Sequence, residues 1–209
     1  MKSKRIYLIR HGQTDYNLKG IVQGSGVNSS INKTGRRQAD AFHAMYRTIR
    51  FDKIYTSELK RTQESVRKFL DKGIPHEVLP GLNEISWGIQ EGREVTEESD
   101  KYYYGVLDEW QKGNTDLQIE GGESPEEVSA RQDEALNHIH SKEGESTILI
   151  CHHGRAMRVL LCKLLNYPLK FMDFFEHTNL GLYQIYFTGS SYVIEKFNDQ
   201  EHLEILETL

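Results

Sequence analysis

Arginine and histidine side chains follow three apolar segments of the sequence, directly where a segment ends or one helical turn later. These residues are Arg10, His11, Arg61, His152 and His153. An arginine guanidinium binds two phosphate oxygens at once, and an imidazole supplies a hydrogen-bond donor or a nucleophile. Gly12 and Gly154 each follow a histidine, and a glycine lets backbone amide groups approach the same anion. The residue types therefore indicate a site for a phosphate group.

Each of these residues has a simple structural explanation when it is taken alone. A histidine at the end of a strand is more often a hydrogen-bonded structural residue than a catalyst. Arg61 could be a partner in a surface salt bridge, and Arg10 could pair with a buried carboxylate. Convergence favours a site, because several cations gathered in one place repel one another unless an anion binds between them.

The elements that would bring these residues together are those of an α/β protein. Segments rich in Val, Ile, Tyr and Phe alternate with segments of helical period, which is typical of a mostly parallel sheet covered by helices. The predicted strands are Arg5–Ile9, Phe51–Thr56, His76–Leu79, Ser146–Cys151, Leu180–Phe187 and Tyr192–Phe197. The last two form an antiparallel hairpin through residues 188–191. Ligands of such sheets bind beyond the carboxyl ends of the strands, where the candidate residues follow.

The helices between the strands have recognisable amino-terminal caps, namely Asn32, Ser57 and Ser124. Ser124 is the best marked of these, because Pro125 and Glu127 supply a proline at the first helical position and a capping-box glutamate. This helix is expected to end near Ser141. Another helix is expected after Gly154.

Length, charge and cysteine content limit the class of protein. The chain has 209 residues and a net charge of -5, which favours one domain and argues against nucleic-acid and membrane-surface partners. The apolar run before Arg10 is too short for a signal peptide or a membrane span. Cys151 and Cys162 are too few for a disulfide framework, so we expect a soluble protein of the cytoplasm. Residues 1–209 are interpreted as one domain, with 93–123 as a lid-like helical insertion.

Six motifs resemble the histidine phosphatase superfamily, specifically its phosphoglycerate mutase-like group. In chain order they are LIRHGQTDYN, VQG, YTSELKRTQES, LNEISWGIQEG, GGESPEEVSAR and ILICHHGRAMRVL. They occur in the family's order along nearly the whole chain. The fold that we expect is a three-layer αβα sandwich, with a mostly parallel central sheet and a small helical insertion over the carboxyl ends of the strands.

The resemblance implies roles for individual residues. His11 matches the nucleophile that accepts the phosphoryl group, and Glu84 matches the proton donor. The residues expected to bind the substrate are Arg10, Asn17, Gln23, Gly24, Arg61, His153 and Gly154. Of these, Arg10, Arg61 and His153 are also expected to be catalytic.

Two adjacent histidines compete for the later catalytic position. The family pattern reads His-Gly, often with an arginine or lysine five places past the histidine, and His153, Gly154 and Arg158 fit this pattern. His152 is off by one residue. We therefore assign the role to His153, and interpret His152 as either a neighbour of the pocket or a buried hydrogen-bonded histidine.

The resemblance implies a metal-independent phosphomonoesterase that acts on a small-molecule phosphate through a phosphohistidine intermediate and needs no cofactor. A mutase dependent on 2,3-bisphosphoglycerate and a catalytically weak phosphate-binding module remain alternatives, as does a metal-dependent hydrolase. The resemblance implies that a mutase would bind the carboxylate of phosphoglycerate with basic residues in the segment after the proton donor, including an adjacent arginine pair. Residues 93–123 have no Arg-Arg pair and contain nine acidic residues against three basic ones. So acidic a segment suits a neutral, zwitterionic or cationic alcohol better than phosphoglycerate. The substrate and the oligomeric state stay open, with a homodimer among the alternatives.

Overall fold

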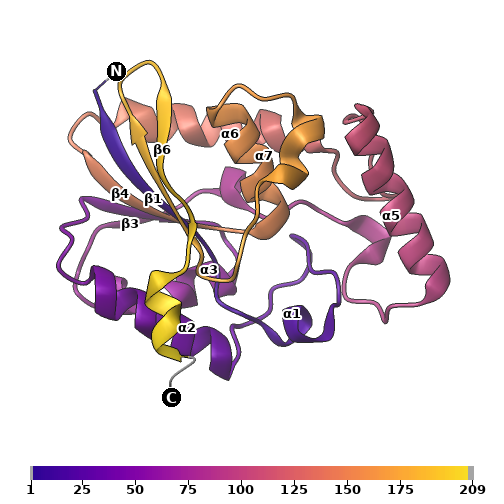
Figure 1. Cartoon of the computed structure of the whole chain (residues 1–209), viewed down its shortest axis with the longest axis horizontal. Helices are drawn as coiled ribbons and strands as arrows, with labels where there is room; N and C mark the ends of the chain where they lie inside the picture. Colours follow the sequence, from indigo (N-terminus) through magenta and orange to yellow (C-terminus); the bar gives the residue numbers. More distant parts are fainter. Residues whose placement is uncertain (1, 207–209) are drawn as a thin grey trace.

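The computed structural model describes residues 2–206, and its centre is a six-stranded sheet in the order β3-β2-β4-β1-β5-β6 (Figure 1). The strands are β1 Lys4–Arg10, β2 Lys53–Thr56, β3 His76–Val78, β4 Thr147–His152, β5 Leu182–Phe187 and β6 Tyr192–Asp199. The four strands from β3 to β1 pair in parallel, whereas β1–β5 and β5–β6 pair antiparallel. The predicted strands and the terminal hairpin are confirmed, with ends that differ by up to two residues.

Helices cover both faces of this sheet. The α-helices are α1 Asp15–Lys19, α2 Lys33–Tyr46, α3 Lys60–Ser65, α4 Arg67–Leu70, α5 Glu97–Lys112, α6 Pro125–Ser141 and α7 Gly154–Leu164. Short 3-10 helices are η1 Pro80–Leu82, η2 Gly88–Gln90, η3 Leu169–Phe174 and η4 Glu201–Leu206. No helix within residues 2–206 is long and apolar enough to cross a bilayer.

The alternation of side chains along β1 explains the three layers. Successive residues of a strand point to opposite faces. Ile6 and Leu8 belong to the core that includes α6 and α7, whereas Tyr7 and Ile9 belong to the core that includes α2. Figure 1 shows α6 and α7 on one side of the sheet and α2 on the other. The αβα sandwich predicted from the sequence is confirmed.

Two of the three predicted caps are confirmed and one is wrong. The side chain of Asn32 accepts a hydrogen bond from the Gly35 N–H, and Ser124 forms the expected capping box at the start of α6. Ser57 does not cap a helix, because α3 begins three residues later. Its hydroxyl is instead engaged by Thr62 and by a histidine of the candidate site.

Residues 93–123 contain α5, which extends to one side of the sheet layers (Figure 1). Thr96 caps this helix with a capping box, and Gly113 ends it with a φ of 110°, a conformation that favours glycine. Val106, Leu107 and Trp110 form its buried face. The segment is therefore anchored by an apolar stripe, although its composition is acidic.

Candidate active site

The ends of β1 and β4 lie side by side and place the first candidate residues. The two strands are parallel and in register, with Arg10 opposite His152, and the His11 N–H donates to the His152 carbonyl oxygen at 2.9 Å. Arg10 is the last residue of β1, and α7 begins at Gly154, two residues after β4 ends. The structure therefore brings these candidate residues together at the edge of the sheet where the sequence predicts them.

His11 is buried, and a backbone carbonyl group next to it fixes the tautomer of its ring. Its Nδ1 lies 2.7 Å from the carbonyl oxygen of Gly12, so Nδ1 carries the hydrogen and Nε2 presents a lone pair. Burial, followed by the charges of Arg61 and Arg10, holds the pKa of His11 well below its usual value. A Cβ at Gly12 would lie 2.8 Å from the Gly35 carbonyl oxygen, so only glycine fits beside His11. The ring is therefore neutral and oriented.

Arg10 is a partly buried cation with an unused donor. Its Nη1 donates to Nδ1 of His177 at 3.2 Å, while its Nε has no partner among residues 2–206. Burial lowers the pKa of Arg10 to about 10, so the guanidinium stays charged at neutral pH. A buried donor without a partner costs roughly 1–3 kcal/mol, and an anion bound beside it would recover this cost.

Arg61 and His153 form a second pair directly behind His11. The Arg61 Nε–H donates to Nδ1 of His153 at 3.2 Å, and the His153 Nε2–H donates to the Ser57 hydroxyl at 2.8 Å. The remaining Arg61 donors reach the carbonyl oxygens of Val27 and Gly24. The rings of His11 and His153 are 5.2 Å apart between centroids. Arg61 thus fixes the ring of His153, and both nitrogens of that ring are engaged.

A cavity of about 320 Å³ opens beside these residues. Its lining residues are Arg10, His11, Tyr16, Asn17, Gly20, Ile21, Val22, Gln23, Glu84, Trp87, Tyr103, Gly154, Arg155, Arg158 and His177. Five predicted substrate or catalytic residues besides His11 therefore line it. Arg61, His153 and Gly24 do not, since Arg61 and His153 are fully buried behind its wall and Gly24 binds Arg61 through its carbonyl group.

The two amide side chains of the cavity are held by Thr14. Asn17 Oδ1 accepts from the Thr14 N–H at 3.1 Å within the capping box of α1, and Gln23 Nε2 donates to the Thr14 hydroxyl at 2.7 Å. Asn179 donates both to Asn17 Oδ1 and to the His11 carbonyl oxygen. These contacts fix the amide groups next to His11.

The carboxylate of Glu84 lies at the amino terminus of α7 and also lines the cavity. Its Oε1 accepts from the N–H groups of Ile85 at 2.9 Å and Ala156 at 2.8 Å, and its Oε2 accepts from Arg155 N–H at 3.2 Å. The first N–H groups of a helix have no partner within the helix and favour a negative charge. Glu84 is therefore fixed at the opening of the helix that follows His153.

The geometry agrees with what comparison of the whole chain finds. Residues 6–200 match the family model described as histidine phosphatase superfamily (branch 1). The chain belongs to the histidine phosphatase superfamily. The resemblance read from the six motifs is confirmed.

Relatives within the superfamily carry different activities in their names. A broad-specificity phosphatase of Saccharomyces cerevisiae is 32% identical over 166 residues, which cover 75% of this chain and 68% of the relative. A Cronobacter sakazakii protein named "probable phosphoglycerate mutase GpmB" is 29% identical, with 96% of this chain and 95% of the relative covered. The structure of an alpha-ribazole phosphatase from Shigella flexneri has a TM-score of 0.82 at 26% identity, covering 94% of this chain and 96% of that one.

His152, the neighbour of His153, is outside the candidate cavity. It is fully buried, and Gln132 Nε2 donates to its Nε2 at 3.3 Å. Burial, with a smaller effect of Arg131, lowers the pKa of His152 to about 3. Two interpretations of His152 were drawn from the sequence. The structure agrees with the second, a buried hydrogen-bonded histidine.

His177 lines the cavity and was missed from the sequence. Burial and then the charge of Arg10 lower its pKa to about 3, so its neutral ring accepts the hydrogen bond from Arg10. It precedes β5, which is antiparallel to β1, so the start of β5 lies at the same sheet edge as the end of β1. A search at the carboxyl ends of strands overlooks residues that precede an antiparallel strand.

A second cationic group in the cavity, also missed, consists of Arg155 and Arg158. Asp173 accepts hydrogen bonds from both guanidinium groups, and Arg155 lies 5.8 Å from the ring centroid of Trp87. From the acidic segment 93–123, only Tyr103 lines the cavity. The charge of that segment therefore does not describe the charge that a substrate meets, and the inference that its acidity disfavours an anionic alcohol does not apply to this cavity.

The metal-dependent hydrolase would need a cluster of metal-binding side chains. Within residues 2–206, no group of three or more His, Cys, Asp or Glu side chains is arranged to hold a metal ion. His152 and His153 have separate partners, Gln132 and the Ser57–Arg61 pair. The candidate site thus consists of arginines, histidines, one carboxylate and two amides.

Proposed function

We propose that this chain is a metal-independent phosphomonoesterase that acts on a small-molecule phosphate through a phosphohistidine intermediate. The observation that carries the proposal is the state of His11: a neutral ring whose Nδ1–H is held by Gly12, and whose Nε2 lone pair is available beside the charged Arg10. A neutral, oriented imidazole next to a fixed cation is what nucleophilic attack on phosphorus requires.

In the first half-reaction, His11 Nε2 attacks phosphorus in line with the ester bond. The N–P bond forms as the P–O bond to the alcohol breaks, and Glu84, protonated in the substrate complex, gives its proton to the departing oxygen. The Arg10 guanidinium stabilises the negative charge on the equatorial oxygens. In the second half-reaction Glu84 takes a proton from water, the water oxygen attacks phosphorus, and the N–P bond breaks to release phosphate.

Arg61 and His153 have a role that depends on one exchange of partners. In the structure the His153 Nε2–H donates to Ser57 and not into the cavity. We propose that this donor turns from the Ser57 hydroxyl to a phosphoryl oxygen when the substrate binds. Arg61 keeps the hydrogen on Nε2, because its Nε–H donates to the other ring nitrogen.

A second candidate function is phosphoglycerate mutase, and Arg155 and Arg158 favour it. Their guanidinium groups line the cavity beyond Arg10 and have the charge that a carboxylate of the alcohol portion would bind. A mutase would return the phosphoryl group from His11 to another hydroxyl of the substrate, whereas a phosphatase transfers it to water. We retain the phosphatase as the main proposal because no Arg-Arg pair follows Glu84 in residues 93–123.

The proposal extends to the organisation of the chain and its compartment. We propose that the chain acts as one domain with residues 93–123 as a lid, because Tyr103 of that segment contributes to the cavity wall. Cys151 and Cys162 are both buried free thiols, which fits a reducing compartment such as the cytoplasm.

The experiment that tests the proposal measures phosphate release from a panel of phosphomonoesters in the presence of a chelator. The panel is repeated with 2,3-bisphosphoglycerate and 3-phosphoglycerate to detect mutase turnover. A labelled substrate quenched in base should leave label on His11, since phosphohistidine survives base, and His11→Ala should abolish both label and turnover. Activity that a chelator abolishes and a divalent ion restores would refute the proposal.

A further inference from the structure

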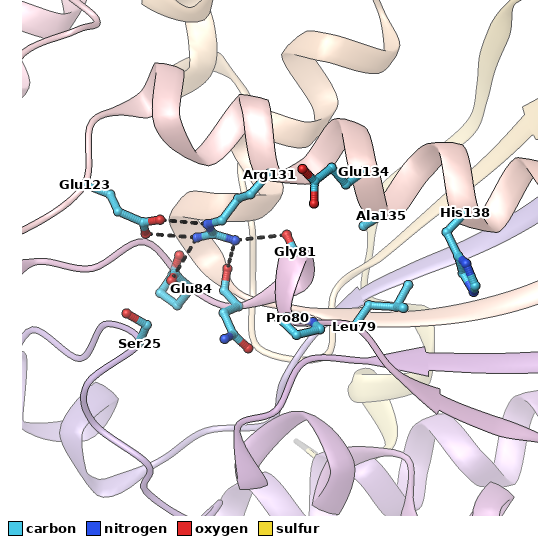
Figure 2. Close-up of a pocket in the computed structure, with 11 residues that line it drawn as sticks. Ser25, Leu79, Pro80, Gly81, Glu84, Glu123, Arg131, Glu134, Ala135 and His138 are labelled. Carbon is cyan, nitrogen blue, oxygen red and sulfur yellow. Dashed lines mark hydrogen bonds and ion pairs between the residues drawn. The ribbon is translucent and has the colours of Figure 1, made fainter.

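The motif GGESPEEVSAR contributes no residue to the candidate cavity, although it is one of the six family motifs. Its Glu123 and Arg131 lie behind Glu84, in the wall of a separate pocket of about 480 Å³. Figure 2 shows the guanidinium group of Arg131 between the carboxylate of Glu123 and the chain segment that runs from Gly81 to Glu84. The two residues therefore contact the backbone of the segment that carries Glu84.

All five N–H donors of Arg131 have acceptors. Nη1 donates to the carbonyl oxygens of Gly81 and Asn83, both at 2.9 Å, and Nη2 donates to the carbonyl oxygen of Glu84 at 3.1 Å. The other two bonds join Nε to Glu123 Oε1 at 2.8 Å and Nη2 to Glu123 Oε2 at 3.1 Å. A guanidinium group has five donors in a rigid plane, and here three of them bind the backbone around Glu84.

Glu123 extends this contact to the other side of Glu84. Its Oε2 accepts from the Ser86 N–H at 2.8 Å, and its own backbone N–H donates to the Ser86 carbonyl oxygen at 2.8 Å. The backbone is thus bonded at residues 81, 83 and 84 by Arg131 and at residue 86 by Glu123. Neither bond set involves the carboxylate of Glu84 itself.

The helix that carries Arg131 is itself held firmly against this segment. Its start is set by the capping box of Ser124, the residue after Glu123. A Cβ at Gly81 would lie 2.6 Å from the carbonyl oxygen of Arg131 and 2.9 Å from Cβ of Ala135, so the segment packs on α6 at a distance that only glycine allows. Movement of the segment relative to α6 would break several of these contacts at once.

We propose that Arg131, paired with Glu123, is a positioning residue for Glu84. The N–H groups at the start of α7 hold the carboxylate, while Arg131 and Glu123 fix the backbone from which that side chain extends. The inference rests on the proposed acid–base function of Glu84, because proton transfer to a leaving oxygen requires hydrogen-bond distance. A misplacement of about 1 Å can cost roughly 10²-fold in rate.

Arg131→Lys is the informative substitution. A lysine ammonium keeps the positive charge but has three donors that cannot span the carbonyl groups of three residues and a carboxylate in one plane. With an alkyl phosphate, whose leaving oxygen needs the proton, we expect turnover to fall about 10- to 100-fold. With an aryl phosphate, the rate of the first turnover should change less than about 3-fold, because a phenolate leaves with little help.

The decisive comparison is a double-mutant cycle with Glu84→Gln. If Arg131 acts through Glu84, then adding Arg131→Lys to Glu84→Gln should not slow the alkyl phosphate further. Asp133→Asn is the matched control, because Asp133 lies on the same helix and pairs with Lys163, away from the Glu84 segment. This substitution should leave the turnover of both substrates unchanged. Urea unfolding of each variant separates a folding defect from a kinetic one.

Glu123→Gln replaces Arg131→Lys in the experiment if the lysine variant does not fold. It keeps the three contacts of Arg131 with carbonyl groups and weakens the ion pair. The loss of turnover should depend on the substrate in the same way but be smaller. Equal loss for alkyl and aryl substrates, or losses that multiply with Glu84→Gln, would overturn the inference. If Glu84→Gln alone shows no dependence on the leaving group, the proposed function of Glu84 fails first and the inference fails with it.

Discussion

Glu84→Gln is the substitution that tests the proposed acid–base step most directly, and the structure gives its cost. The carboxylate accepts three backbone N–H bonds, two at Oε1 and one at Oε2. A glutamine can keep the two bonds at Oε1, but its NH₂ group would face the Arg155 N–H and leave that donor without a partner. The lost bond and the lost charge at the start of α7 cost about 2–3 kcal/mol together. Domains are usually stable by about 5–15 kcal/mol, so the variant should fold.

The kinetic effect should depend on the alcohol that leaves. With an alkyl phosphate, the missing proton slows the formation of the phosphohistidine, so turnover should fall by about 10²–10⁴-fold without a burst. With an aryl phosphate, formation of the phosphohistidine should stay fast, while its hydrolysis stalls because no general base activates the water. A burst of one phenol per active site should then precede a slow steady state.

Rapid mixing with p-nitrophenyl phosphate measures the burst, and base quenching with labelled substrate measures the phosphoenzyme. His11→Ala is the control, because without the imidazole neither burst nor label can form. Equal losses with both substrates and no burst from either would mean that Glu84 is not the acid–base residue. The next candidates for the acid–base residue would then be Glu91 and Glu94, the first carboxylates that follow Glu84 in the sequence.

Three further predictions concern other residues of the site. His153→Ala should lower turnover by on the order of 10²-fold, whereas His152→Ala should mainly lower the free energy of unfolding; kinetic penalties in the reverse order would show that the assignment is off by one. Arg155→Met should raise KM for 3-phosphoglycerate at least 10-fold more than for glycerol 3-phosphate, and an equal rise would exclude a contact with the carboxylate. Between pH 7.5 and 5.5, the free energy of unfolding should fall by about 1.4 kcal/mol for each of His152 and His177, as urea titration can measure. The sign follows because each folded pKa is about 3, so only the unfolded chain takes up the proton as the pH falls through about 6.5; a total loss below about 1 kcal/mol would contradict it.

Local signals explain what the sequence could predict. The central strands β1 and β4 each have an apolar run, and Ser124, Pro125 and Glu127 mark the start of α6 by short-range chemistry that holds in the structure. The position of His11 follows in the same way, because the end of a buried strand is set by the point at which the apolar run stops.

Features that depend on tertiary contacts could not be predicted. Ser57 has the residue type of a cap, but its hydroxyl is used by His153, which is distant in the sequence. His177 joins the site only because β5 runs antiparallel to β1. The acidity of residues 93–123 is a property of composition, and composition does not show that Tyr103 is the residue which faces the cavity.

The burial of Arg10 and His11 at the end of an apolar strand has opposite effects on their charges, and both effects serve the proposed chemistry. Burial lowers the pKa of Arg10 only to about 10, so it remains a cation at any physiological pH. The same burial, with the nearby arginine charges, moves the pKa of His11 well below its usual value, so it remains neutral. An exposed histidine with a pKa of about 6.5 would lose part of its nucleophilic form to protonation near neutral pH. The apolar residues that precede Arg10 therefore do more than place the site: at one pH they keep both the charge and the lone pair that the proposed reaction needs.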